Sequence, residues 1–243
     1  MLQYRELFYK QYYSSQLGRK SVNYNKKLKE ETSQLQREIL PLMPSNKDGI
    51  IVDLGCGIGS LVSMFLTSGY SQSSGVDVSE EMVNVAHQLQ INQVTQGDIT
   101  EFLKAHKNHF DVITGIDIIE HFTKDELVNL LLQIKEALKP GGIAIFRTPN
   151  LDAPYSTIYA NGDFTHENYL NPSSAKQVML NCGYGEVAVL PSLIRIQNPI
   201  KEILRKMIWS CYSFRIKVEL FASGRSSDVI LTPNMLIRVV KAN

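Results

Sequence analysis

The segment Ile51-Val-Asp-Leu-Gly-Cys-Gly-Ile-Gly59 decides the fold of this 243-residue chain. A short apolar run, typical of a buried strand, leads directly into three glycines at alternate positions, and a helical stretch follows. Glycine permits a tight turn and leaves room for a ligand to approach the backbone. The N–H groups at the start of the next helix can face the same ligand. The segment therefore predicts a strand, a ligand-binding turn and a helix.

The pattern continues on both sides of this turn. Short apolar runs alternate with helical stretches, which is typical of a parallel sheet with helices on both faces. We expect strands at 50–54, 74–77, 94–96, 110–115, 143–148, 186–190 and 229–240. We expect helices near 59–68, 80–90, 100–107 and 123–138, and another that starts at Pro172 and ends at Gly183. Ser79 can cap the second of these, and Thr123-x-x-Glu126 matches a capping box for the fourth, which Lys139-Pro-Gly-Gly142 would end. The chain is thus an α/β protein.

The spacing of the three glycines distinguishes between two classes of nucleoside cofactor. Dinucleotide enzymes use Gly-x-Gly-x-x-Gly, and the third glycine of that pattern would fall here on Ser60. Asp77 ends the second expected strand and can accept hydrogen bonds from both hydroxyls of a ribose. Asp98 follows the third and can accept from an exocyclic amine. These features predict an adenosine cofactor without phosphates, and a nicotinamide dehydrogenase is the alternative.

The chain resembles the class I S-adenosylmethionine-dependent methyltransferases. Five motifs, in the order found in that family, carry the resemblance: Val52-Asp-Leu-Gly-Cys-Gly-Ile-Gly59, Gly75-Val-Asp-Val-Ser79, Gln96-Gly-Asp-Ile99, Phe110-Asp-Val-Ile113 and Leu138-Lys-Pro-Gly-Gly142. The resemblance implies a Rossmann-like fold with a seven-stranded, mostly parallel sheet whose last strand is antiparallel. It also implies S-adenosyl-L-methionine as cofactor, bound in a crevice over the carboxyl ends of the strands.

The same resemblance implies the cofactor-binding residues by position: Asp53, Gly55, Gly57, Gly59, Asp77, Val78, Met82, Asp98, Ile99 and Asp117. The glycines would lie under the methionine and ribose, and Asp77 would hold the ribose. Met82 would pack on the adenine, whose edge Asp98 and Ile99 would read. For Asp53 a second role stays open, in which its carboxylate only orients the turn through hydrogen bonds to the backbone.

Two histidines are candidate catalytic residues. Methyl transfer from a sulfonium requires an aligned acceptor and, for a hydroxyl, a base that removes its proton. Histidine suits this role near neutral pH. His121 lies in Asp117-Ile-Ile-Glu-His121, just after the fourth expected strand, and His166 lies in Gly162-Asp-Phe-Thr-His-Glu167. The alternative for each is a hydrogen bond that anchors its loop.

The acceptor-side loop at 149–171 resembles methyltransferases encoded among cell-surface polysaccharide genes, such as O-antigen and capsule enzymes. This implies a sugar hydroxyl or a phosphate of a glycan precursor as acceptor, with Asn150, Asp163 and Glu167 as binding residues. Asn168-Tyr-Leu170 departs from the aromatic residue and threonine that usually follow His-Glu there. The alternatives are a methyltransferase of a small metabolite, either a quinone precursor or an amine, and a non-catalytic binding protein on the same fold.

Two helical segments lie outside the sheet pattern. We expect residues 1–45 to form an N-terminal helical lid ahead of a methyltransferase domain at 46–243. Tyr12 and Tyr13 are candidate acceptor contacts in that lid, although an aromatic stripe that packs the helix on the sheet would explain them equally. A helical insertion at 199–222 carries basic residues and Trp209, which suit a peripheral membrane contact, a homodimer contact or core packing.

The overall composition bounds the remaining possibilities. With 44% hydrophobic and 20% charged residues and a formal net charge of +1, the chain is neither disordered nor a general nucleic-acid binder. No apolar run reaches the roughly 18 residues that a transmembrane segment needs. Three cysteines, far apart and without ligand spacing, argue for a reducing compartment and against a zinc site or a disulfide framework. We therefore expect a cytoplasmic protein with no bound metal and no nucleic-acid partner.

Overall fold

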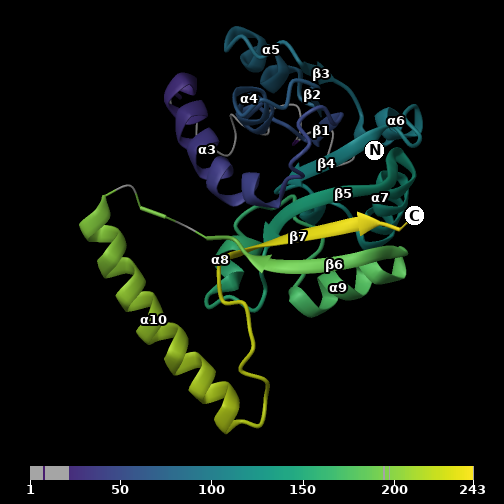
Figure 1. Ribbon diagram of the computed structural model, residues 1–243. Coiled ribbons are helices and arrows are strands. Elements are labelled where there is room, and N and C mark those ends of the chain that lie inside the picture. Colours follow the sequence, from purple (N-terminus) through teal and green to yellow (C-terminus); the bar gives the residue numbers. More distant parts are fainter. Residues whose placement is uncertain (1–7, 9–21, 194, 197, 243) are drawn as a thin grey trace.

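A seven-stranded sheet forms the centre of the molecule (Figure 1). The computed structural model describes residue 8 and residues 22–193, 195–196 and 198–242. The strands are β1 (Ile51–Leu54), β2 (Ser73–Asp77), β3 (Val94–Gln96), β4 (Phe110–Ile116), β5 (Leu138–Pro149), β6 (Tyr184–Pro191) and β7 (Asn234–Lys241). Their order is β3-β2-β1-β4-β5-β7-β6, and β7 is antiparallel to both of its neighbours while the other pairs are parallel. The expected fold is confirmed.

Helices cover both faces of this sheet (Figure 1). The helices between residues 22 and 242 are α3 (Tyr24–Glu38), α4 (Ser60–Thr67), α5 (Glu80–Gln88), α6 (Ile99–Lys104), α7 (Lys124–Ala137), α8 (Ser156–Ala160), α9 (Pro172–Asn181) and α10 (Pro199–Ala222). Two 3₁₀ turns, η1 (Leu40–Leu42) and η2 (Ile119–His121), precede β1 and follow β4. The strand order reverses between β1 and β4, so the site at which such sheets bind ligands lies over the carboxyl ends of these two strands.

Side-chain caps fix where several helices begin. The Ser79 hydroxyl accepts a hydrogen bond from the backbone N–H of Met82 at the start of α5. Thr123 and Glu126 form a capping box at the start of α7, as the sequence predicts. Asn171 caps α9 in the same reciprocal way with Ser174. The helices that follow the strands therefore begin at defined residues, which fixes the loops at the carboxyl ends of β2 and β4.

The starts of β5 and β7 differ from the sequence prediction by five residues each. The strand predicted at 143–148 begins at Leu138, because α7 runs directly into β5, and Leu138 pairs with Phe110. Gly141 has φ +72 and the register with β4 shifts here, so the glycines form a bulge within the strand and do not end it. β7 begins at Asn234, five residues later than expected, directly after Pro233, which has no N–H to donate to a neighbouring strand.

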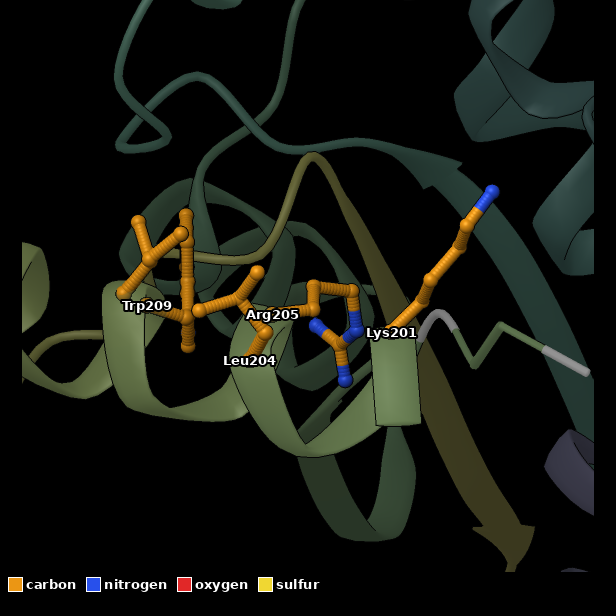
Figure 2. Close-up of a pocket in the computed structure, with 5 residues that line it drawn as sticks. Lys201, Leu204, Arg205 and Trp209 are labelled. Carbon is orange, nitrogen blue, oxygen red and sulfur yellow. The ribbon is translucent and has the colours of Figure 1, made fainter. Parts of the chain in front are cut away.

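Helix α10 stands away from the sheet, and the chain that follows it returns to β7 (Figure 1). Five residues on one side of it line an open depression of about 320 Å³ (Figure 2): Lys201, Leu204, Arg205, Ile208 and Trp209. Among the described residues, no helix combines the length and apolar character that crossing a membrane requires. The insertion predicted at 199–222 is thus a single long helix on the outside of the molecule.

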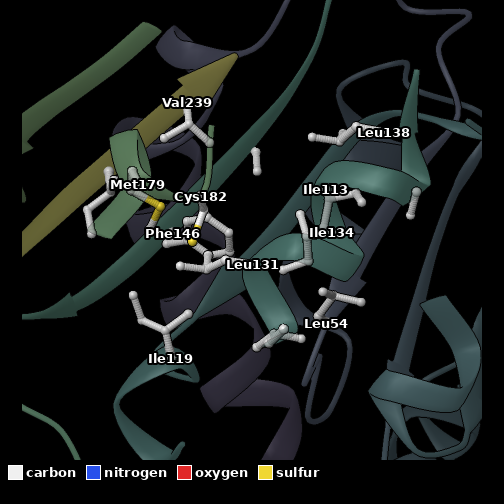
Figure 3. Close-up of a cluster of buried hydrophobic side chains, with 14 of the residues drawn as sticks. Leu54, Ile113, Ile119, Leu131, Ile134, Leu138, Phe146, Met179, Cys182 and Val239 are labelled. Atoms are coloured by element: carbon white, nitrogen blue, oxygen red, sulfur yellow. The ribbon is translucent and has the colours of Figure 1, made fainter. Parts of the chain in front are cut away.

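The core is divided by the sheet into two sides. Val112 and Ile113 are both fully buried, but they belong to different clusters because successive strand residues point to opposite faces. The larger cluster joins β4 and β5 to α7 and α9, and it includes Leu131, Phe146 and Met179 (Figure 3). A second cluster packs α3 and α4 on the opposite face. The sheet is therefore held rigidly beneath the loops at its carboxyl edge.

Candidate active site

The glycine turn after β1 is open at one position. Gly55, Gly57 and Gly59 all have positive φ, at 66°, 52° and 76°, a conformation that side chains disfavour. A Cβ atom at Gly55 would clash with the side chain of Ile118, whereas a Cβ at Gly57 would have no heavy atom within 4 Å. The space next to Gly55 is thus filled by Ile118, whereas the space next to Gly57 is open, and a ligand could approach the backbone closely there.

The carboxylate of Asp77 is held against this turn. Its Oδ2 accepts a hydrogen bond from the N–H of Gly57 at 2.7 Å, and its Oδ1 accepts from the N–H of Ser79 at 2.8 Å. Burial raises the pKa of Asp77, although both hydrogen bonds oppose the shift. Val78 follows with 52% of its surface exposed. An acceptor for hydroxyls and an apolar platform therefore lie side by side at the end of β2.

Asp98 caps α6 and keeps one oxygen available. Its Oδ1 accepts from the N–H groups of Thr100 and Glu101, at 2.9 and 3.0 Å, and from the Thr100 hydroxyl. Within the described part of the chain, Oδ2 accepts no hydrogen bond. Burial raises the pKa of Asp98, but the hydrogen bonds outweigh it and the pKa lies below the ordinary value. Ile99 is buried in the core beside it. Asp98 is therefore a charged acceptor at the edge of the site.

Met82 lies deeper than the adenine-packing role would suggest. Its side chain is 5% exposed and packs in a cluster with Ile58 and Val85, and Tyr24 and Leu28 of α3 cover that cluster. Met82 thus links α5 to α3 in this structure. Its contact with a ligand stays a prediction.

Asp53 is a buried acid beneath the turn. It is 3% exposed and accepts a hydrogen bond from the Thr114 hydroxyl at 2.7 Å. Burial raises its pKa to about 7, while the Thr114 hydrogen bond lowers it and the nearby charge of Asp77 raises it further. Asp53 therefore changes charge near neutral pH. Its hydrogen bond joins β1 to β4, a cross-strand partner that differs from the backbone groups expected.

The ion-pair partners of Arg147 are a feature of the site that the sequence did not predict. The Nε of Arg147 donates to Asp117 Oδ1 at 3.0 Å and its Nη2 pairs with the other oxygen, while Nη1 donates to Glu38 at 3.2 Å. Burial alone would lower the pKa of Arg147, but these carboxylates raise it above its ordinary value. Asp117 itself has φ +53. One guanidinium thus fixes the residue after β4 to the end of α3.

The two candidate histidines meet at the carboxyl end of the sheet. The rings of His121 and His166 are edge to face, with centroids 4.8 Å apart. His166 Nδ1 lies 2.8 Å from the carbonyl oxygen of Ala160, which can only accept, so this nitrogen carries a proton. His121 Nδ1 lies 2.9 Å from the hydroxyl of Thr165, which donates its own proton to Asp163 Oδ1. When neutral, each histidine therefore has its lone pair on Nε2.

A buried glutamate completes this cluster. Glu120 is 2% exposed, accepts from the Thr148 hydroxyl at 3.1 Å, and has a pKa that burial and the charge of Asp117 raise to about 8. Burial and the neighbouring His166 lower the pKa of His121. One oxygen of Glu120 and one nitrogen of each histidine lie within 4.8 Å of one another. These donor types suit a divalent metal ion, so the absence of a metal stays a prediction.

The remaining acceptor-side residues have varied surroundings. Asn150 is buried and its amide donates to the carbonyl oxygens of Ile230 and Thr232, at 2.7 and 3.0 Å, so it holds the segment before β7. Asp163 accepts from Thr165, and Glu167 is exposed while its backbone N–H donates to the Glu120 carbonyl. The predicted contacts Tyr12 and Tyr13 lie outside the described residues.

An aromatic pair joins the N-terminal segment to this loop. The rings of Phe8 and Phe164 stack with centroids 5.3 Å apart. Phe164 follows Asp163, in the loop that carries His166. This contact agrees with an N-terminal segment that covers the acceptor side, and the lid at 1–45 stays a proposal.

The chain was compared with known proteins. A family model described as a methyltransferase domain matches residues 24–188. A ubiquinone biosynthesis O-methyltransferase from Coxiella burnetii is 33% identical over 104 residues, which are 41% of this chain and 43% of that protein. One from Azoarcus sp. is 26% identical over 171 residues, which are 63% and 70% of the two chains. These names do not support the polysaccharide resemblance. The chain spans less than half of the Coxiella relative.

A solved structure shows the same fold. A SAM dependent methyltransferase from Archaeoglobus fulgidus superposes with a TM-score of 0.65 at 20% sequence identity, over 88% of this chain and 94% of that one. The family model covers more than half of the chain, and it includes the glycine turn, both histidines and the sheet from β1 to most of β6. This chain therefore belongs to the methyltransferase domain family and has the fold of S-adenosylmethionine-dependent methyltransferases.

Proposed function

We propose that this chain is an S-adenosylmethionine-dependent O-methyltransferase whose acceptor is a hydroxyl of a small metabolite, with phenolic quinone precursors as the favoured class. The observation that carries the proposal is the position of Ile118. Its side chain packs against Gly55 and Gly115, and three residues later the same segment presents His121 beside His166. The open glycine turn and the histidine pair are therefore parts of one site.

The residues around the turn fit an adenosine cofactor with a charged sulfur. Space above Gly57 admits a ligand close to the backbone, Asp77 can accept from a ribose, and Oδ2 of Asp98 can accept from an adenine amine. Carboxylates favour a cationic group nearby. When bound, the cofactor would supply a methyl group on a positively charged sulfur.

The histidine pair supplies the base. The proton on Nδ1 of His166 is held by the Ala160 carbonyl, which leaves Nε2 to accept the proton of an acceptor hydroxyl. The lowered pKa of His121 keeps this neighbour neutral, and Thr165 and Asp163 fix its orientation. A phenol has a more acidic hydroxyl than a sugar, so a base of this kind removes its proton more easily.

The acceptor class draws its support from the relatives. Those from Coxiella and Azoarcus are both named for O-methylation in ubiquinone biosynthesis. A sugar hydroxyl or phosphate of a glycan precursor is the second candidate, supported by the motif pattern of residues 149–171. A neutral amine can attack the methyl group without the help of a base, whereas a hydroxyl must first lose its proton. The two ordered histidines therefore favour a hydroxyl acceptor over an amine.

Two measurements test the proposal. Titration calorimetry with S-adenosylhomocysteine should show micromolar binding, and Asp77→Ala should weaken it by ~10-fold or more because hydrogen bonds to a charged group contribute about 1.5–3 kcal/mol. Glu80→Gln removes an exposed acid at the start of α5 and serves as the matched control. Absence of binding by the unsubstituted protein would rule out the cofactor.

The acceptor is then identified with labelled cofactor. Dihydroxybenzoates and catechol-type quinone precursors, sugar nucleotides, phosphosugars and primary amines are offered in parallel. Label in the phenols supports the favoured class. Label in the phosphosugars or sugar nucleotides would move the assignment to glycan precursors, and label in the amines alone would reject an O-methyltransferase.

A further inference from the structure

Helix α10 carries an outward apolar surface that the proposed catalytic function does not use. Six large apolar residues, which we call the outer stripe, are between 48% and 77% exposed: Ile200, Ile203, Met207, Phe214, Val218 and Phe221. Their spacings of three, four and seven residues place them on one side of the helix. With 24 residues, the helix is roughly 36 Å long, so the stripe is long and continuous.

The opposite side of α10 differs. The residues there are partly or fully buried: Glu202, Arg205, Trp209, Tyr212, Ile216 and Leu220. Glu202 accepts from Arg205 at 2.8 Å and from the backbone N–H of Ile196 at 2.9 Å, which fixes the start of the helix. The start of the helix is therefore fixed, and the outer stripe lies on the side opposite these partly buried residues.

Basic residues flank the outer stripe. Lys206 and Lys217 lie along one flank, and Lys201 and Arg215 along the other, as the helical period places them. The helix has five Lys or Arg against two Glu, a net charge of +3. Two such helices from different copies would repel each other, whereas an anionic surface would attract them. The charge distribution thus argues against a second copy as the occupant.

The depression on this helix adjoins the stripe on one flank. Leu204, Ile208 and Trp209 form its apolar part, and Lys201 and Arg205 bring positive charge to it (Figure 2). An apolar surface beside cations matches the boundary between acyl chains and phosphate headgroups.

We infer that α10 lies on the surface of an anionic phospholipid bilayer, with the outer stripe in the boundary between headgroups and acyl chains. Its basic flanks would then contact lipid phosphates. The inference is independent of the proposed methyl acceptor. Burial, and a hydrogen bond with Tyr155 just before α8, raise the pKa of Tyr212, so α10 contacts the acceptor-side loop. A bound membrane would therefore lie near the entrance for the acceptor.

Vesicle sedimentation tests this inference with the full chain. Vesicles of phosphatidylcholine alone are compared with vesicles in which about a third of the lipid is phosphatidylglycerol. The protein should bind the anionic vesicles, and added salt should weaken the binding because it screens the charges. Met207→Ser with Phe214→Ser should lower the partition coefficient by ~10-fold or more, since apolar burial drives insertion. Lys206→Glu with Lys217→Glu should remove the preference for anionic lipid.

Matched controls keep the test decisive. Val128→Ser with Leu132→Ser changes two exposed apolar residues, 38% and 42% exposed, on α7, and should leave vesicle binding unchanged. Circular dichroism melting shows that each variant is folded. Binding that is absent in the unsubstituted protein, or equal in the stripe variant, would overturn the inference. A dimer in sedimentation velocity that the stripe substitutions dissociate, without vesicle binding, would assign the stripe to a second copy.

Discussion

The imidazole rings of His121 and His166 contact each other edge to face, although one follows β4 and the other lies in the loop beyond β5. The Nδ1 of each ring is hydrogen-bonded to an oxygen between β5 and α9, the Thr165 hydroxyl for His121 and the Ala160 carbonyl at the end of α8 for His166. The hydrogen bonds that the sequence could equally have assigned to loop anchoring therefore also set the tautomer of a base. Anchoring and catalysis are compatible roles for these two residues.

Substitution of the base should separate turnover from cofactor binding. We expect His166→Ala to lower kcat by ~100-fold or more, the usual contribution of general acid–base catalysis, while the affinity for S-adenosylhomocysteine stays unchanged. His109→Ala is the control, because His109 is an exposed histidine at the other end of β4. Steady-state kinetics with the identified acceptor measure both. Equal kcat in the two variants would contradict the assignment.

Substitution in the glycine turn should separate strain from steric exclusion. Gly57→Ala and Gly224→Ala both place a side chain at positive φ, and a Cβ at either position has no heavy atom within 4 Å. Each should lose about 1–2 kcal/mol of stability. Only Gly57→Ala should also weaken the binding of S-adenosylhomocysteine, by ~10-fold or more, because the alanine methyl group enters the space that the ligand would occupy.

Calorimetry and urea unfolding on the same two variants provide the check. If Gly224→Ala lowered the affinity for S-adenosylhomocysteine as strongly as Gly57→Ala, backbone strain and not the open space would explain the loss of affinity.

The pH dependence of stability should reflect Glu120. Burial raises its pKa to about 8, so the folded chain keeps a proton that the unfolded chain loses at a lower pH. The stabilisation is complete below the unfolded pKa and is lost as the pH rises through the folded pKa. Between about pH 5 and 8 the slope from this group is on the order of 1 kcal/mol per pH unit. Asp53, with a pKa of about 7, acts in the same direction.

Glu120→Gln removes the titrating group and keeps its shape. Its free energy of unfolding, measured in urea at several pH values, should fall less steeply than that of the unsubstituted protein. Parallel curves for the two proteins would show that Glu120 does not gain a proton on folding.

Loss of the Arg147 guanidinium should destabilise the chain strongly. Arg147→Met leaves the buried carboxylate of Glu38 without its cation, which typically costs about 3–5 kcal/mol. Arg215→Met breaks the exposed pair with Glu219 and should cost less than about 1 kcal/mol. Urea unfolding measures both. A similar small loss in both variants would mean that the Arg147 network contributes no more than a surface pair.

The sequence predicted the features that depend on interactions between residues close together in the chain. The glycine turn and the caps at Ser79 and Thr123 depend on neighbours in sequence, and the structure has them at the predicted positions. The glycine pair at 141–142 suggested the end of a helix, but Gly141 forms a bulge inside β5. A glycine at positive φ is common in both places, so the sequence does not distinguish them. Asp98 was placed at the correct strand end, but its role as a helix cap was not anticipated.

Long-range contacts account for what the sequence did not reveal. The meeting of His121 and His166 depends on the path of the loop after β5, and no local pattern encodes that path. Arg147 stands near the carboxyl end of an apolar strand, which was the available signal for a buried ion pair, but its partners come from α3 and the turn after β4. Glu120 was visible only as half of a Glu-His pair.

The direct passage of α7 into β5 restricts where this chain can vary in length. Ala137 ends the helix and Leu138 begins the strand, and both are fully buried. An inserted residue there would rotate one element against the other and would misplace Arg147 and Thr148. The segments before α9 and after α10 have no such junction. Natural relatives should therefore differ by insertions and deletions on the acceptor side of the sheet, while this joint keeps a constant length.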